Sequence, residues 1–219
     1  MEGTVLFDVD GTLVDTNYHH SLAWFRAFRR QSLTVPLWRI HRAIGMGGDQ
    51  LVAAVGGEQA EAEHGDDVRA AWAEEFQRML DEVTVLEGAH RALADVVAHG
   101  FQLVLASSSP PEHIEHYLDL LEARGLADAW TSAADVSQTK PAPELLEVAL
   151  EKVNGQRAVV VGDSRWDCIA AGRIGLPAVA LLTGGICAQE LIDSGASTVY
   201  ESLDDLRADI DALPLAPKA

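Results

Sequence analysis

Cysteine is rare in this 219-residue chain, and no long hydrophobic run occurs in it. Cys168 and Cys187 are too few for a disulfide framework or a cysteine-based zinc site, which fits a reducing compartment. No stretch approaches the roughly 18 apolar residues that a membrane span needs, and no basic segment followed by an apolar one opens the chain. We therefore expect a cytoplasmic protein that does not cross a membrane.

Positive charge is also scarce. The chain has 16 lysines and arginines against 34 aspartates and glutamates, a formal net charge of −18. Such a protein repels nucleic acids and anionic membranes, so neither is expected as a partner. An anionic small molecule would need a local positive site. Only Lys140, Lys152 and Lys218 are lysines, so each is easy to weigh as a candidate for such a site.

Apolar runs that are typical of buried strands recur along the chain and alternate with helical patterns. The expected strands cover residues 4–6, 101–106, 129–133, 158–161, 178–182 and 198–200. Repeated strand and helix units of this kind produce a parallel sheet covered by helices on both faces. The sequence therefore predicts an α/β fold with a doubly wound parallel sheet. The tail that contains Pro214 and Pro217 is expected to be loose.

Residues 16–85 break this alternation because they contain helical patterns and no convincing strand. Apolar residues at helical spacing predict long helices at 16–31 and 58–82. We interpret the segment as an all-helical insertion. The predicted domains are thus a core made of residues 1–15 and 86–219 and a helical domain made of residues 16–85.

A glycine-rich stretch, Gly45-Met46-Gly47-Gly48-Asp49, lies inside the helical insertion. Such a stretch could cradle a phosphate, but no strand precedes it and it lacks the Lys-Ser/Thr of a P-loop. We interpret it as a turn between two helices.

The most distinctive stretch follows the first strand and reads Asp8-Val9-Asp10-Gly11-Thr12. Ligands of open α/β sheets bind beyond the carboxyl ends of the strands, where these residues would lie. Side chains two positions apart on a strand point the same way, so Asp8 and Asp10 should project together and need a cation. Alone, an Asp-x-Asp is more often an acidic turn than a site.

Other strands also end in polar groups. Ser107 follows the strand at 101–106, and Gly162-Asp163-Ser164 with Asp167 follows the strand at 158–161, while Lys140-Pro141 leads into a helix. Parallel strands place their ends on one edge of the sheet, so these groups should converge near Asp8. Singly, each has an ordinary explanation: a helix cap for Ser107 and Asp167, or a surface lysine for Lys140.

The four motifs, in this order, resemble those of the haloacid dehalogenase superfamily. The resemblance covers nearly the whole chain, and the helical insertion resembles the cap domain of that family. Within the superfamily the chain looks most like the branch of phosphoglycolate phosphatase and β-phosphoglucomutase, which Thr183-Gly184-Gly185 also suits. The resemblance implies a Rossmann-like core with an inserted helical cap.

The resemblance also implies a reaction. We expect a Mg²⁺-dependent phosphatase that hydrolyses a small phosphorylated metabolite through an aspartyl-phosphate intermediate. Asp8 would be the nucleophile and Asp10 the general acid and base, while Lys140 would offset negative charge. Asp8, the main-chain carbonyl of Asp10 and Asp163 would hold Mg²⁺, a hard ion that prefers oxygen ligands.

Further residues receive supporting roles from the same resemblance. The expected phosphate-binding residues are Ser107, Ser108, Gly11 and Thr12, and Asp167 and Ser164 would support the metal ligands. The candidate hinge and cap residues are Asp15, Thr16, His20 and Arg42. Asp15 and Thr16 could cap the helix that follows. His20 is either a sensor of cap closure or a solvated helix histidine.

Several alternatives stay open at this point. A β-phosphoglucomutase-like reaction would use the same core, and a non-catalytic regulatory or binding domain could keep the fold. Dehalogenation needs no second acid, so Asp10 counts against it, and phosphonoacetaldehyde hydrolysis needs a cap lysine, of which there is none before Lys140. A nucleotide-sugar transferase with an Asp-x-Asp site would leave Asp163 unexplained. The sequence does not identify the substrate or the oligomeric state, for which a monomer is one option.

Overall fold

A parallel sheet forms the centre of the computed structural model, which describes residues 3–217 of the chain, so Lys218 lies outside the described residues. The strand order is β3-β2-β1-β4-β5-β6, and each neighbouring pair is parallel. The strands are β1 (Thr4–Phe7), β2 (Gln102–Ala106), β3 (Ala129–Thr131), β4 (Arg157–Gly162), β5 (Ala178–Leu181) and β6 (Ala196–Tyr200). The predicted doubly wound α/β fold is confirmed.

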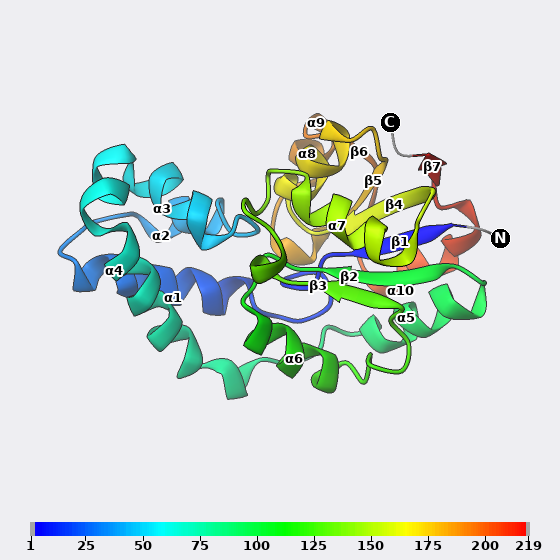
Figure 1. Ribbon diagram of the computed structural model, residues 1–219, viewed down its shortest axis with the longest axis horizontal. Helices are drawn as coiled ribbons and strands as arrows, with labels where there is room; N and C mark the ends of the chain where they lie inside the picture. The colour runs from blue at the N-terminus through cyan, green and yellow to red at the C-terminus, as the bar shows by residue number, and fades with distance from the viewer. Residues whose placement is uncertain (1–2, 218–219) are drawn as a thin grey trace.

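Helices cover both faces of this sheet (Figure 1). They are α5 (Ala89–Ala98), α6 (Pro111–Leu120), α7 (Glu144–Val153), α8 (Arg165–Arg173), α9 (Ala188–Asp193) and α10 (Leu203–Ala208). Alternate residues of a strand point to opposite faces, so Val5 and Phe7 pack with α5, α6 and α10, whereas Leu6 packs with α7, α8 and α9. Burial of β1 on both faces explains why its sequence is a continuous apolar run.

The C-terminal tail corrects one prediction. Instead of being loose, Ala216–Pro217 forms a short strand, β7, which pairs antiparallel with Arg157 and Ala158 of β4. Leu215 packs against the core of the sheet, and its carbonyl accepts a hydrogen bond of 3.1 Å from Arg157. These tertiary contacts hold the tail in place. The prediction of a loose tail rested on two prolines, and such contacts are not visible in the sequence.

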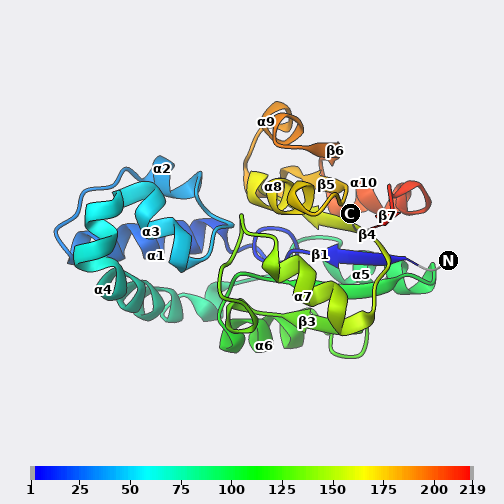
Figure 2. The ribbon, with the colours of Figure 1, turned by 45° about the horizontal axis from the view of Figure 1, so that its top comes forward.

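The helical insertion, residues 17–82, lies beyond the end of the sheet that is opposite the N-terminus (Figure 2). Its elements are α1 (Asn17–Arg30), α2 (Leu37–His41), α3 (Gly48–Gly56), α4 (Glu58–Gln77) and a 3₁₀ turn at Leu80–Glu82. It has a small core of its own, which includes Trp24, Phe28 and Leu51. No helix within residues 3–217 is long and apolar enough to cross a membrane.

The helix expected at 58–82 is shorter than predicted. It ends at Gln77, and the chain tightens into the 3₁₀ turn so that Met79, Leu80 and Val83 all reach the core of the sheet. At the other end of the insertion, Thr16 occupies the N-cap position of α1 without a side-chain cap hydrogen bond. Its hydroxyl donates instead to Asp10, so the predicted capping role of Thr16 is wrong.

The register of the sheet brings the predicted motifs to one edge. Phe7, the last residue of β1, pairs with Leu105 of β2 and with Val161 of β4. The three strands therefore end nearly level, and their next residues include Asp8, Ser107 and Asp163. The helical insertion lies beyond this same edge of the sheet (Figure 1).

Candidate active site

Lys140 lies at the centre of a buried cluster of charges. Its Nζ contacts Asp8 Oδ1, lies 2.7 Å from Asp167 Oδ1 and donates a hydrogen bond of 3.1 Å to the carbonyl of Ala106. Burial alone would lower the pKa of Lys140, but the charges of Asp167 and Asp8 raise it above its ordinary value. Lys140 is therefore a permanent cation beside Asp8, as the convergence of the motifs predicts.

Asp163 joins this cluster through hydrogen bonds. The Thr12 hydroxyl lies 3.1 Å from Asp163 Oδ1 and 3.0 Å from Asp8 Oδ2. Asn17 at the start of α1 donates a hydrogen bond of 2.7 Å to Asp163 Oδ2. Burial, and then repulsion by Asp167, raises the pKa of Asp163 to about 7 despite these donors.

Three carboxylates of the cluster are arranged to share a cation. Asp8, Asp163 and Asp167 are buried, and each offers one oxygen such that the three oxygens lie within 4.8 Å of one another. Burial also raises the pKa of Asp8, and Lys140 only partly offsets this effect. Three carboxylates beside one ammonium leave excess negative charge, and oxygen donors suit Mg²⁺. The residues therefore fit the expected ion.

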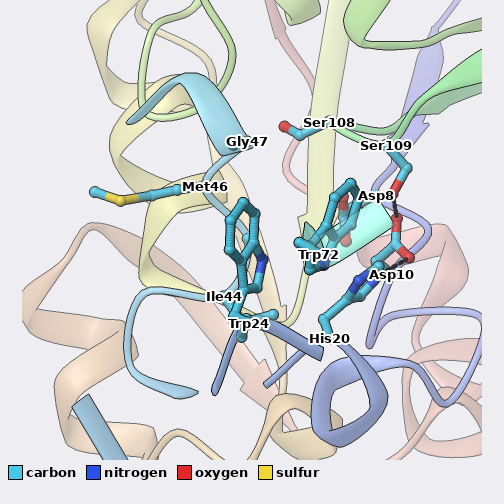
Figure 3. Close-up of a pocket in the computed structure, with 12 residues that line it drawn as sticks. Asp8, Asp10, His20, Trp24, Ile44, Met46, Gly47, Trp72, Ser108 and Ser109 are labelled. Carbon is cyan, nitrogen blue, oxygen red and sulfur yellow. Dashed lines mark hydrogen bonds and ion pairs between the residues drawn. The ribbon is translucent and has the colours of Figure 1, made fainter. Parts of the chain in front are cut away.

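The side chain of Asp10 belongs to a separate network, shown in part in Figure 3. Its Oδ1 accepts a hydrogen bond of 3.1 Å from Thr16 and lies 2.9 Å from His20 Nε2, and its Oδ2 accepts hydrogen bonds of 2.9 Å from Ser107 and 2.8 Å from Ser109. Burial would raise the pKa of Asp10. The hydrogen bond and charge of His20 and the two serine hydroxyls outweigh it, so this pKa lies well below its usual value.

Asp8 and Asp10 follow directly after strand β1, and the tight loop that begins there gives their side chains different hydrogen-bond partners. Strand β1 ends at Phe7, so the alternation of a strand does not extend to Asp10. Gly11 has φ +79°, and a Cβ there would collide with Asn17 and Asp163. Both acids line one cavity, but they have different partners. The predicted metal contact of the Asp10 carbonyl stays a prediction.

The expected phosphate-binding residues divide into two groups. The N–H of Gly11 bonds the carbonyl of Val14 at 2.8 Å and the N–H of Thr12 bonds that of Val9 at 3.3 Å. These donors are occupied, so Gly11 and Thr12 shape the loop and are not free to bind phosphate here. Ser108 lines the cavity, and its buried hydroxyl has no hydrogen-bond partner within residues 3–217. It is a donor available to an anion.

The Ser107 hydroxyl is committed to the neighbouring network. It donates to Asp10 and accepts a hydrogen bond of 2.9 Å from the N–H of Ser109. Ser109 was missed by the sequence interpretation, which gave phosphate-binding roles to Ser107 and Ser108 and none to Ser109. Asn17 was also missed because no pattern in the sequence links it to a residue 146 positions away.

Asp167 and Ser164 connect the charge cluster to α8. The N–H and the hydroxyl of Ser164 donate hydrogen bonds of 3.2 and 2.6 Å to Asp167 Oδ2, which forms a capping box. The other oxygen of Asp167 faces Lys140. Asp167 therefore caps the helix, as the sequence suggested, and also belongs to the group of three carboxylates. Its expected support of the metal ligands stays a prediction.

His20 is buried, so the alternative of a solvated helix histidine is wrong. Its ring stacks on Phe76 with the ring centres 4.0 Å apart and lies against Trp72. Arg42 lies elsewhere, in an ion pair of 2.6 Å with Glu190 of α9, and it does not line the cavity. Asp15 is exposed at the junction with the helical insertion.

A cavity lies between the sheet edge and the helical insertion (Figure 3). Its walls are Asp8, Asp10, Ser108 and Ser109 on one side and His20, Trp24, Trp72 and residues 44–48 on the other. The space that this cavity leaves for water-sized groups is about 40 Å³.

The motif order and this geometry agree with a family assignment. The model of the haloacid dehalogenase-like hydrolase family matches residues 5–181. The chain belongs to this family, as its motifs predicted.

Relatives support the same class. A validoxylamine A 7′-phosphate phosphatase of Streptomyces hygroscopicus subsp. limoneus is 29% identical over 84% of this chain and 87% of that protein. A phosphoglycolate phosphatase of Colwellia psychrerythraea is 24% identical over 92% of this chain and 94% of that protein. The crystal structure of a hydrolase from Pseudomonas syringae superposes with a TM-score of 0.90 and 30% identity, covering 96% and 98% of the two chains. The chain is therefore a hydrolase, and its named relatives here are phosphatases.

Proposed function

We propose that this chain is a Mg²⁺-dependent phosphatase that hydrolyses a small phosphomonoester through an aspartyl-phosphate on Asp8. The observation that carries the proposal is the buried group of Asp8, Asp163 and Asp167 around Lys140, beside an independently held Asp10. A structural role would not require three buried carboxylates, because burying charge is costly. Relatives that are phosphatases support the same reaction.

The first step transfers the phosphoryl group to the protein. A carboxylate oxygen of Asp8 attacks phosphorus as the bond from phosphorus to the leaving oxygen breaks, and Asp10 donates a proton to that oxygen. Bound Mg²⁺ supplies positive charge that offsets the charges of the phosphate and of Asp8. Lys140 adds a fixed cation, and the Ser108 hydroxyl is placed to donate to a phosphoryl oxygen.

The second step releases phosphate. Asp10, now a carboxylate, takes a proton from water while the water oxygen attacks phosphorus, and Asp8 leaves as a carboxylate. The lowered pKa of Asp10 keeps it in the carboxylate form that this second role requires. For the first role Asp10 must carry a proton, and His20 Nε2 at 2.9 Å is the neighbour with which it can share one. Ser107 and Ser109 hold Asp10 in place for both steps.

We further propose that residues 16–85 act as a mobile cap on the core made of residues 1–15 and 86–219. The cap provides the walls of the cavity away from the acids, including Trp24, Ile44 and Trp72. Of the described residues that line this cavity, none is a lysine or arginine. These walls suit a neutral leaving group, and they offer no cation to a second phosphate. A phosphosugar mutase, which must rebind a doubly phosphorylated intermediate, is therefore less well supported.

The test is phosphate release from a panel of sugar phosphates, phosphoglycolate and nucleotides, with and without Mg²⁺. Wild-type protein should release phosphate from at least one member, and only with Mg²⁺. Asp8→Asn should abolish this activity, and Asp67→Asn on the exposed face of α4 should retain it. Unchanged release by Asp8→Asn would refute the mechanism. Conversion of β-glucose 1-phosphate to the 6-phosphate without net phosphate release would favour the mutase.

A further inference from the structure

The glycine-rich loop at residues 45–49 joins α2 to α3 at the inner edge of the helical insertion. The sequence interpretation as a turn between helices agrees with its position. The same loop, however, contacts the core at two places, residues 139 and 164. Each of these contacts lies next to a residue of the charge cluster.

The first contact is a closed set of hydrogen bonds between Asp49, Gly47 and Thr139. The carboxylate of Asp49 accepts from the N–H of Thr139 at 3.1 Å and, through its other oxygen, from the Thr139 hydroxyl. The Thr139 oxygen in turn accepts a hydrogen bond of 3.0 Å from the N–H of Gly47. Hydrogen bonds to a carboxylate are roughly twice as strong as those between neutral groups.

Close packing against the core at both places explains why residues 45 and 47 are glycines. A Cβ on Gly47 would collide with the Thr139 hydroxyl, and a Cβ on Gly45 would lie 2.6 Å from Ser164 Oγ. Gly45 also has φ +97°, which favours glycine. The backbone of the loop therefore lies so close to the core that neither position can carry a side chain.

Thr139 directly precedes Lys140, and both are buried. If the insertion moves away to admit substrate, Gly47 and Asp49 move with α3, whereas Thr139 stays with the core. Opening must then break all three hydrogen bonds of the set. Closure restores them and fixes the main chain next to the ammonium that faces Asp8.

We propose that Asp49 is a positioning residue, which binds Thr139 on closure and so fixes Lys140 for catalysis. The proposal rests on the proposed phosphatase function. The same contact that holds the insertion against the core thus also holds the main chain that directly precedes Lys140. Residues that close a site over its substrate commonly affect turnover.

The activity test uses two matched pairs of variants and p-nitrophenyl phosphate with Mg²⁺. Thr139→Val keeps the shape and removes the hydroxyl, whereas Thr139→Ser keeps the hydroxyl. Asp49→Ala is matched by Asp67→Ala, an exposed acid on α4. We expect kcat to fall about tenfold in Thr139→Val and Asp49→Ala, with KM within about threefold of wild type, a change of about 1.4 kcal/mol in the closed state. Thr139→Ser and Asp67→Ala should stay within about twofold of wild-type kcat.

A second readout does not depend on turnover. With Mg²⁺ and inorganic phosphate, small-angle X-ray scattering should give a smaller radius of gyration for wild type and Thr139→Ser than for Asp49→Ala and Thr139→Val. This measurement tests the closing contact of Asp49 with Thr139 even if no phosphomonoester is hydrolysed. The proposal is overturned if Thr139→Val and Asp49→Ala keep wild-type kcat and radius, if only KM changes, or if Thr139→Ser falls as far as Thr139→Val.

Discussion

Asp8 and Asp10 are two positions apart in the chain, and their surroundings shift their pKa values in opposite directions. Burial raises the pKa of Asp8, which has other carboxylates nearby and Lys140 as its cation. Hydrogen bonds and the charge of His20 more than offset burial for Asp10 and lower its pKa. Asp8 therefore needs an additional cation to be a carboxylate nucleophile, whereas Asp10 is a carboxylate without one. Asp8 can therefore act as the nucleophile once a cation is bound, and Asp10 is already in the form that the base of the second step needs.

His113 provides a test at the scale of a single residue. It is buried between Phe76 and Tyr117, and burial lowers its pKa to about 4 from an ordinary 6.5. Between these values the unfolded chain binds more protons than the folded protein, so His113 destabilises the protein as the pH falls. From pH 7 to pH 5 this residue should remove about 2 kcal/mol from the free energy of unfolding.

Urea unfolding of wild type and His113→Phe at pH 7 and pH 5 measures this contribution. The loss of stability on acidification should be about 2 kcal/mol smaller in the variant. His90→Gln, at an exposed histidine of α5, is the control. Its loss of stability from pH 7 to pH 5 should equal that of wild type. Identical losses in wild type and His113→Phe would show that burial does not lower the pKa of His113.

At the scale of the element, the start of α8 combines a helix cap with the charge cluster. Ser164 donates a hydrogen bond of 2.6 Å to Asp167, whose other oxygen faces Lys140. The start of α10 has the same Ser–Asp pair at the same distance, formed by Ser202 and Asp205 far from the site. The chain thus contains a matched control for the cap.

Ser164→Ala and Ser202→Ala should each lower the free energy of unfolding by about 1 kcal/mol, because each removes an N-cap side chain. Only Ser164→Ala should also lower kcat, by about fivefold, since Asp167 loses a hydrogen bond that orients it. Thermal unfolding and phosphate release measure the two effects. Equal kcat values in the two variants would mean that Ser164 acts on stability alone.

The elements were predictable where local pattern decides the structure. Short runs such as Val159-Val160-Val161 are buried on both faces of the sheet and therefore read as strands. The antiparallel β7 was not predictable, since Leu215 and Ala216 adopt their place through contacts with Gly3 and β4. The same limit applied to the loop at residues 45–49, whose partner Thr139 is 90 positions away from Asp49.

At the scale of the whole molecule, the site forms where the sheet edge meets the helical insertion. Asp8, Lys140 and Asp163 could be predicted to converge because parallel strands share one carboxyl edge. The partners of these residues could not, because Asn17, His20 and Ser109 reach the site through the packing of α1 and of the serine loop. The motifs therefore predict the reacting residues, whereas the packing of the helical insertion and the serine loop determines their hydrogen-bond partners.

The central claim is that Asp8 carries the phosphoryl group, and a burst experiment tests it most directly. p-Nitrophenolate leaves without needing a proton, so Asp10→Asn should still transfer the phosphoryl group to Asp8 but hydrolyse it slowly. We predict a rapid burst of about one p-nitrophenolate per Asp10→Asn molecule with Mg²⁺, and mass spectrometry should find the phosphoryl group on the peptide that contains Asp8. Asp8→Asn should give no burst. A burst from Asp8→Asn, or a phosphoryl group on another residue of Asp10→Asn, would contradict the account.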